Sequence, residues 1–194
     1  MVVDTATKKV FVTSPNDRKL AGVAYPKFNA SFINNFTIFK NISVSLQFDW
    51  RYGSSIYNLT RQWLYRDRLS ADYDKQVTIG GQTGAFVSFY NSLYNNVSPI
   101  SWFVENAAML RLRDASVSYN LSQKYRPKWL RSAALTIAAR NLFTITKYTG
   151  LDPEATNTND AQGNAAKGIG AINGVDLFGV PNLKTYIITL NLGF

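Results

Sequence analysis

The sequence contains neither cysteine nor histidine. Without cysteine the chain cannot form disulfides, thiolate metal sites or a cysteine nucleophile. Without histidine it lacks the commonest general base, a frequent zinc ligand and the side chain that titrates between about pH 5 and 8. Hydrolysis by a carboxylate pair would remain, but the pair Asp152 and Glu154 flanks a proline and is better explained as a turn. We therefore expect no catalytic residues and no enzyme.

Long apolar runs are also absent, because no stretch of 18 apolar residues occurs. The sequence therefore predicts no transmembrane helix. The first residues lack the charged region, apolar core and cleavage site of a signal peptide. The net charge of +9 comes from 21 Lys and Arg against 12 Asp and Glu, and no basic run is longer than two residues, as in Lys8-Lys9. The basic residues are spread along the chain without a nucleic-acid-binding motif, so we expect no nucleic-acid partner.

Strict alternation of apolar and polar residues is present instead. Residues 42–52 alternate without exception, and successive side chains of a strand point to opposite faces. About 11 residues suffice for a tilted strand to cross a bilayer. The last residues, 183–194, also alternate, with one apolar face and one mostly polar face, and they end on an aromatic, as a closing barrel strand does. The polar positions of the first stretch are candidates to face a barrel lumen: Ser43, Ser45, Gln47, Asp49 and Arg51.

Five such strands are predicted, joined alternately by short and long connections. A slip of the alternation near Arg113 indicates a β-bulge or the emergence of the strand from the membrane. Five strands would leave two open edges, which a membrane does not tolerate, so we expect an all-β, antiparallel part of a larger barrel. The alternative is a soluble carbohydrate-binding β-sandwich. The strands are expected near 26–37, 42–52, 106–120, 133–146 and 183–194.

The long connections carry candidate contacts for a ligand. Residues 58–69 are predicted to form a short helix, and the Gly- and Asn-rich residues after it a loop. Residues 157–164 offer oxygen ligands of the kind that bind Ca²⁺, but they lack the spacing of an EF-hand, and a polar loop is the favoured alternative. Aromatic side chains can stack on sugars, but packing of the loop against its neighbours is the favoured explanation for any single one of them. The aromatic candidates for contact with a ligand are Trp63, Tyr65, Tyr90 and Trp102.

Several short motifs are grouped between residues 103 and 154. They combine an acidic residue, a Leu-Arg-Leu segment and a strand ending in Tyr with an Asn-Leu-Phe-Thr run, a Tyr-x-Gly step and Asp-Pro-Glu. With the terminal Phe194, this set resembles the C-terminal end of SusC/RagA-type TonB-dependent outer-membrane proteins of Bacteroidota. The motif residues are Glu105, Leu110, Arg111, Leu112, Tyr119, Asn141, Leu142, Phe143, Thr144, Tyr148, Gly150, Asp152, Pro153 and Glu154.

The resemblance implies a barrel of about 22 strands with a plug in its lumen. Residues 1–194 would form the C-terminal part of that barrel, without the plug and the N-terminal strands. Such a protein imports oligosaccharides or peptides across the outer membrane with a SusD-like surface lipoprotein as its lid, and TonB acts on it through the plug. The lumen-facing candidates would meet plug or solute, the apolar faces would meet lipid, and Phe194 would carry the barrel-assembly signal. No cofactor is implied.

Overall fold

The computed structural model describes residues 2–11, 19–94, 100–154 and 174–194. The chain divides into two compact units. The sheet unit consists of Pro26–Tyr52, Ala108–Lys147 and Pro181–Phe194, and the loop unit consists of Met1–Tyr25, Gly53–Ala107 and Tyr148–Val180. The strands predicted to span a membrane all lie in the sheet unit, and the long connections between them, together with the first 25 residues, make up the loop unit.

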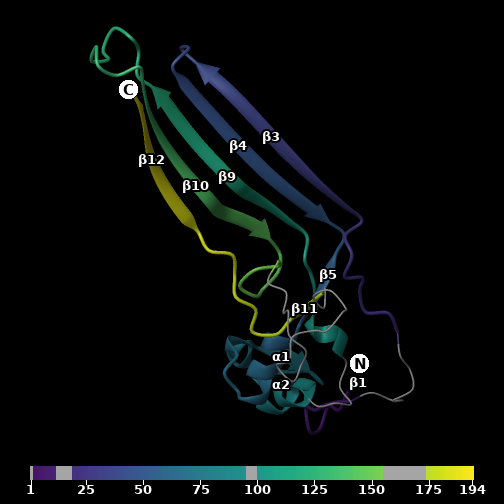
Figure 1. The fold of residues 1–194 in the computed structure, drawn as a ribbon. Coiled ribbons are helices and arrows are strands. Elements are labelled where there is room, and N and C mark those ends of the chain that lie inside the picture. Colours follow the sequence, from purple (N-terminus) through teal and green to yellow (C-terminus); the bar gives the residue numbers. More distant parts are fainter. Residues whose placement is uncertain (1, 12–18, 95–99, 155–173) are drawn as a thin grey trace, which may run out of the picture. The chain divides into compact units, whose positions relative to one another are not determined.

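One antiparallel sheet of five strands forms the sheet unit (Figure 1). Its spatial order is β12-β10-β9-β4-β3, so each strand pairs with the next of the five along the chain. This confirms the five predicted strands and their antiparallel arrangement. A β-sandwich would divide the long strands between two sheets, so the soluble sandwich is not what the chain forms. The strands are β3 (Phe28–Ile38), β4 (Ile42–Tyr52), β9 (Met109–Asn120), β10 (Ser132–Thr146) and β12 (Thr185–Gly193).

The two faces of this sheet differ in polarity. Directly paired residues share a face, and the pairs Val44–Val117 and Val117–Ile137 belong to the apolar one. Large side chains remain exposed on it, since Val117 is 47%, Ile137 54% and Ile188 75% accessible. An apolar surface that extends over five strands would drive association in water, whereas lipid covers such a surface on the outside of a barrel.

A β-bulge in β9 keeps this face continuous. Gln47 pairs with Asp114 and Phe48 with Leu112, so Arg113 is the extra residue. In a regular strand, the even-numbered Leu110 and Leu112 would point away from the face of the odd-numbered Val117. The extra residue brings all three onto the same apolar face. The bulge predicted from the phase slip near Arg113 is thereby confirmed.

The loop unit is built from short elements. The helix α1 (Leu59–Arg66) confirms the helix predicted at 58–69, and the side chain of Asn58 caps it by accepting a bond of 2.8 Å from the Arg61 amide. The expected loop after it was wrong in part: Gly80 and Gly81, both at positive φ, turn a small hairpin, and a second helix follows. The further elements are β5 (Ser55–Asn58), η1 (Ala71–Asp74), β6 (Val77–Ile79), β7 (Gln82–Gly84), α2 (Val87–Tyr94), η2 (Ile100–Phe103), β8 (Val104–Asn106) and β11 (Val175–Asp176).

Near the beginning of the chain, β1 (Val2–Val3) pairs with β2 (Val10–Phe11). Val10 joins an aromatic core that also contains Tyr65, Leu93 and Phe103, each 0% accessible. Among the described residues, no helix is long and apolar enough to cross a membrane.

Candidate functional site

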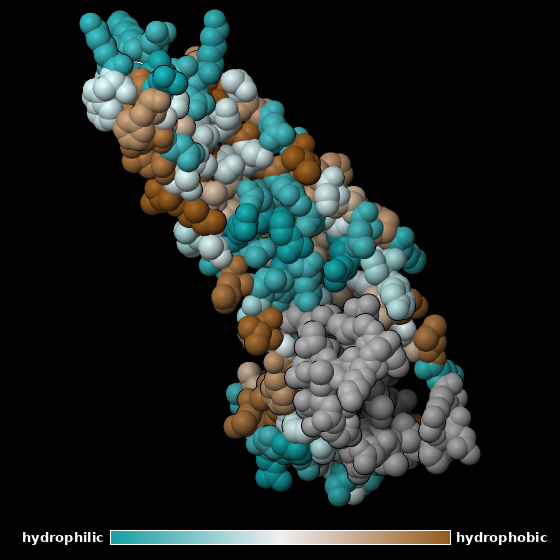
Figure 2. Space-filling model, viewed as in Figure 1, coloured by the Kyte–Doolittle hydropathy of each residue, from teal (hydrophilic) through white to brown (hydrophobic). Residues whose placement is uncertain are grey.

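The first candidate site is the polar face of the five-stranded sheet. On this face lie Ser43, Ser45 and Gln47 of β4. Their partners on β9 are Ser118, Ser116 and Asp114, respectively. In Figure 2 hydrophilic side chains gather over the middle of the sheet, between more hydrophobic margins. The polar positions singled out in the sequence therefore lie together with polar positions of the neighbouring strands.

A hydrogen-bonded chain runs across this face at the bulge. The carboxylate of Asp49 accepts bonds from Ser31 at 2.9 Å, from Gln47 at 3.1 Å and from the Arg113 guanidinium at 2.6 Å. Arg113 also donates to the Asn141 side chain at 3.4 Å. Asn141 donates in turn to the carbonyl oxygen of Leu183 at 3.1 Å. Residues of β3, β4, β9 and β10, and the residue two before β12, are thus joined.

Asn141 has a backbone φ of +52°. This left-handed conformation strains most side chains but is tolerated by Asn and Gly. It falls within the irregular pairing of β10 with β9, between Arg140 and Phe143. The motif residue Asn141 therefore has a structural role that the sequence did not reveal: it turns the backbone at the irregular pairing and bonds both Arg113 of β9 and the segment that leads into β12.

Asn141→Ala is expected to destabilise the sheet by about 2–3 kcal/mol, since Ala adopts the left-handed conformation poorly and makes neither hydrogen bond. Asn141→Gly removes the same bonds but keeps the conformation, so it should cost about 1 kcal/mol less. Urea unfolding of the complete barrel in detergent measures both. Equal stability of the wild type and Asn141→Ala would contradict this role.

The second candidate site is an ionic cluster in the loop unit. The Arg61 guanidinium bridges Asp72 at 2.7 Å and Glu105 at 3.1 Å. Asp72 also contacts Lys75 at 2.5 Å and accepts a bond of 2.7 Å from the buried Tyr65 hydroxyl. These interactions connect α1, η1 and β8 at positions far apart in the sequence.

The cluster sets the protonation of its members. Burial by itself would raise the pKa of Asp72, but hydrogen bonds from Lys75, Tyr65 and Arg61 hold that pKa well below its usual range. Burial is the main reason that the pKa of Tyr65 is raised to about 12. The folded loop unit therefore favours an ionised Asp72 beside a neutral Tyr65.

The stability of the loop unit should depend on pH at both extremes. Because the pKa of Asp72 is lower in the folded than in the unfolded chain, ionised Asp72 stabilises the fold at pH values above the unfolded pKa of 3.8. This contribution is lost as the pH falls below 3.8 towards the folded pKa. A raised Tyr65 pKa stabilises the fold below pH 10, and this contribution is lost as the pH rises from 10 towards 12. Chemical unfolding followed by tryptophan fluorescence should show that Asp72→Asn lowers the midpoint near neutral pH, and that the difference shrinks below about pH 4. A pH-independent difference would contradict the assignment.

The motif residues that follow β10 anchor the connection between β10 and β12 within the loop unit. Glu105 accepts bonds of 2.8 Å from the amide and the hydroxyl of Thr149. The buried Tyr148 hydroxyl donates to Asp176. A Cβ on Gly150 would approach the Tyr148 ring to 2.4 Å, so a side chain there would displace it. The buried carboxylate of Asp152 accepts a bond of 2.9 Å from the Glu154 amide, which is the turn predicted at Asp-Pro.

A pocket of about 470 Å³ opens beside the cluster within the loop unit. Its position was not expected from the sequence, because its wall joins α1 and η1 to residues about 80 positions or more further along the chain. The polar part of the wall comes from Asn58, Thr60, Arg61, Asp72, Thr149 and Asp176, and the apolar part includes Leu64, Leu69, Leu151 and Phe178. Such a mixed wall suits a small ligand or one side chain of a larger one. The Ca²⁺ candidate at 157–164 lies outside the described residues.

The four aromatic candidates have different surroundings. Tyr65 and Tyr90 are buried in the aromatic core, 5.9 Å apart between ring centroids, so we no longer expect either to stack on a ligand. Their burial agrees with the alternative explanation for these aromatic residues, which was packing of the loop against its neighbours. Trp63 is half-buried with its ring edge-on to Phe178 at 5.8 Å and Arg66 over its face at 4.3 Å. Trp102 stays partly exposed and donates to the Tyr65 hydroxyl at 3.4 Å.

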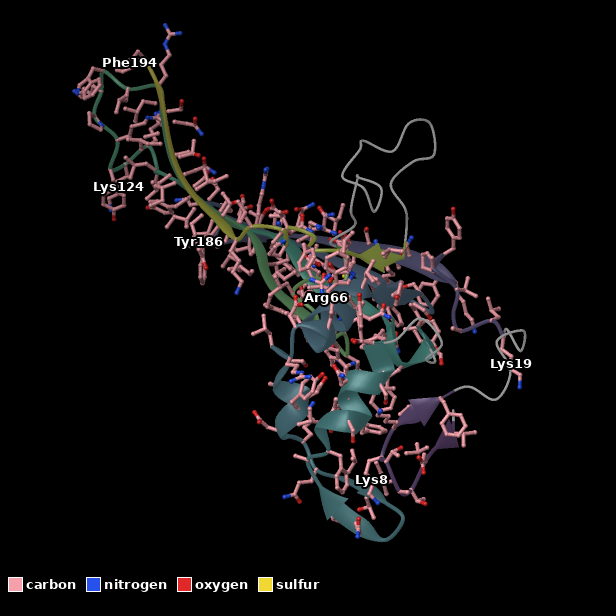
Figure 3. All side chains as sticks on the ribbon, turned by 90° about the horizontal axis from the view of Figure 1, so that it is seen from below. Lys8, Lys19, Arg66, Lys124, Tyr186 and Phe194 are labelled. Atoms are coloured by element: carbon pink, nitrogen blue, oxygen red, sulfur yellow. The ribbon has the colours of Figure 1, made fainter. Side chains whose placement is uncertain are left out.

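The remaining motif residues lie in the sheet unit or in the turn after Gly150. Tyr119 and Phe143 are exposed on the apolar face, at 41% and 43%. Arg111 is buried on the polar face opposite Asp49, and Pro153 is buried in the loop unit. Phe194 is exposed, and its ring stacks on Trp129 at 5.8 Å. Figure 3 places Phe194 and Lys124 at one end of the sheet and Tyr186 towards the other end of β12.

Comparison with known proteins relates the chain to outer-membrane receptors. TonB-dependent receptor P3 of Formosa agariphila is 30% identical over 182 residues, which cover 93% of this chain and 18% of that protein. TonB-dependent receptor P39 of the same organism is 27% identical over 195 residues, again covering 18% of its length. The chain thus spans 18% of the length of these relatives. No protein-family profile matches it.

Solved structures show the same fold. The RagAB peptide importer in its closed-closed state superposes with a TM-score of 0.62 and 20% identity, over 91% of this chain and 18% of that one. The open-open state gives a TM-score of 0.55 and 23% identity over 88% of this chain and 17% of that one.

Five long antiparallel strands with an exposed apolar face, in the fold of an outer-membrane transporter, define a segment of an outer-membrane β-barrel. The sequence relationship agrees with this class of protein: over 93% of its length the chain is similar to a TonB-dependent receptor, and its fold is that of the matching part of the RagAB importer. It is accordingly a protein of the outer membrane.

Proposed function

We propose that residues 1–194 form the C-terminal part of the barrel domain of a TonB-dependent importer. The observation that carries this proposal is the five-stranded sheet with one apolar and one polar face, in a chain that matches TonB-dependent receptors over 93% of its length. The apolar face meets lipid and the polar face lines the lumen. There Ser43, Ser45, Gln47, Asp49 and Arg51 contact the plug or the passing solute.

The loop unit is proposed to receive the solute or the lid protein. The RagAB complex is a peptide importer, and the chemistry of the pocket in this chain suits a side chain of a peptide or a sugar unit with an apolar face. A SusD-like surface lipoprotein is the partner we propose for this unit, with Trp63 and Trp102 as contact residues. TonB would act through a plug domain. Phe194 is proposed as the signal for assembly of the barrel.

The pocket gives a direct test of import. In cells that carry the complete receptor, Ala71→Trp should fill the pocket and reduce growth on the imported nutrient, supplied either as a mixture of oligosaccharides or as a peptide digest. Thr78→Trp, at an exposed position of strand β6 in the same unit, is the matched control and should grow as the wild type. Loss of TonB should abolish growth on that nutrient. Growth that depends on neither TonB nor the receptor would contradict the proposal.

A further inference from the structure

The positive charge of the chain, spread in the sequence, is segregated in the structure. The sheet unit contains twelve Lys and Arg but only two acidic residues, Asp49 and Asp114. The loop unit holds the remaining ten acidic residues and nine basic ones, so the sheet unit accounts for the whole excess of positive charge. Such a field attracts an anionic partner.

Much of this charge gathers at one end of the sheet. The short turn at 39–41, the connection at 121–131 and the last residues meet there, because Asn120 donates to the Asn41 carbonyl at 2.8 Å and the Arg131 amide donates to the Gly193 carbonyl at 2.7 Å. No Asp or Glu occurs between Asp114 and Asp152. The basic turn cluster, as we name it, consists of Lys40, Lys124, Arg126, Lys128 and Arg131.

Exposed aromatic rings accompany the basic turn cluster. Tyr125 is 68%, Trp129 65% and Phe39 89% accessible. Trp129 and Phe194 stack with an interplanar angle of 18° and therefore present a combined apolar surface. Tyr and Trp are enriched where a membrane meets water, since their rings are apolar and their edges are wet.

We propose that the basic turn cluster binds the phosphate groups of anionic phospholipids at the membrane surface. Lys and Arg side chains reach from the turn to the headgroups, while Tyr125, Trp129 and Phe194 enter the boundary of the acyl chains. A phospholipid fits both parts, because it offers an anionic group next to an apolar one. The chain lies in an outer membrane, and short turns of bacterial barrels face the periplasm, so the leaflet on that side supplies the lipid.

The test measures lipid preference of the complete receptor in detergent. Phosphatidylglycerol and phosphatidylcholine with the same acyl chains are titrated separately, and bound lipids are counted by native mass spectrometry. Lys124→Gln, Arg126→Gln and Lys128→Gln together should weaken phosphatidylglycerol binding at least about tenfold, since each basic residue near an anionic surface contributes about fivefold. Lys128→Gln alone should show about a fivefold loss, and the charge-retaining set K124R, R126K and K128R should bind as the wild type.

The matched control removes three exposed charges from the other end of the same sheet, through Lys27→Gln, Lys147→Gln and Lys184→Gln. This variant should keep the preference for phosphatidylglycerol. The proposal is overturned if the turn variants keep this preference too, if the control loses as much, or if the wild type binds phosphatidylcholine as tightly as phosphatidylglycerol. Folding of every variant is verified by its heat-dependent migration on gels.

Discussion

Leu46→Lys is expected to destabilise the inserted barrel by about 2–4 kcal/mol, the cost of a basic residue on the lipid face near the middle of a bilayer. Leu46 lies near the middle of β4 and pairs with Ala115 and Asn34 on the apolar face. A loss of this size is a large part of the stability of a domain. The variant should therefore reach the membrane in much smaller amounts than the wild type.

Ser45→Lys is the matched control for Leu46→Lys, because it introduces the same side chain one residue away on the polar face. Ser45 pairs with Ser116 and Asn35, so its Lys would enter a polar environment. The amount of folded, heat-modifiable receptor in outer-membrane fractions compares the two. Equal amounts, or a larger loss for Ser45→Lys, would reverse the assignment of the faces.

Arg61→Met is expected to loosen the loop unit and to leave the sheet unit intact. Met keeps much of the length of the side chain but leaves Asp72 and Glu105, each only 10% exposed, without their shared cation. Breaking a buried ion pair costs about 3–5 kcal/mol, and the 21% exposure of Arg61 reduces this to about 2–3 kcal/mol. Limited proteolysis of the complete receptor should then cut within residues 53–107 much faster.

Arg66→Met supplies the control on the same helix. Arg66 bonds Asp67 at 2.7 Å, but the two side chains are 42% and 45% exposed, and surface ion pairs contribute about 0–1 kcal/mol. Its proteolysis should resemble that of the wild type. If Arg61→Met were cut no faster than Arg66→Met, the ionic cluster would not stabilise the unit.

The sheet could be predicted from the sequence because the residues of a membrane strand alternate between an apolar, lipid-facing set and a polar, lumen-facing set. In β4 and β12 the alternation alone locates the strand and its apolar face, without knowledge of the neighbours. The bulge at Arg113 could be predicted for the same reason, since it disturbs the alternation. Its partner Asn141 could not, because an Asn that turns a strand has no periodic signature.

The loop unit was harder to predict because its stability comes from contacts between distant positions. Arg61 meets Glu105 across 44 residues, and Tyr148 meets Asp176 across 28. The helix α2 (Val87–Tyr94) is only 8 residues long and was missed, since a helix of that length depends on packing rather than on intrinsic propensity. Burial of Tyr65 and Tyr90 likewise follows from the packing of three separate elements.

Cysteine labelling along β4 tests the central claim, that one face of this sheet lines an aqueous lumen and the other meets lipid. The chain has no cysteine of its own, so each position from 42 to 52 can be replaced singly in a complete receptor freed of other cysteines, and its reaction with a charged maleimide measured. The account predicts reaction at the positions of Ser43, Ser45, Gln47, Asp49 and Arg51 and protection at the alternate positions between Val44 and Trp50. Uniform reaction, or reaction at the alternate positions, would contradict it.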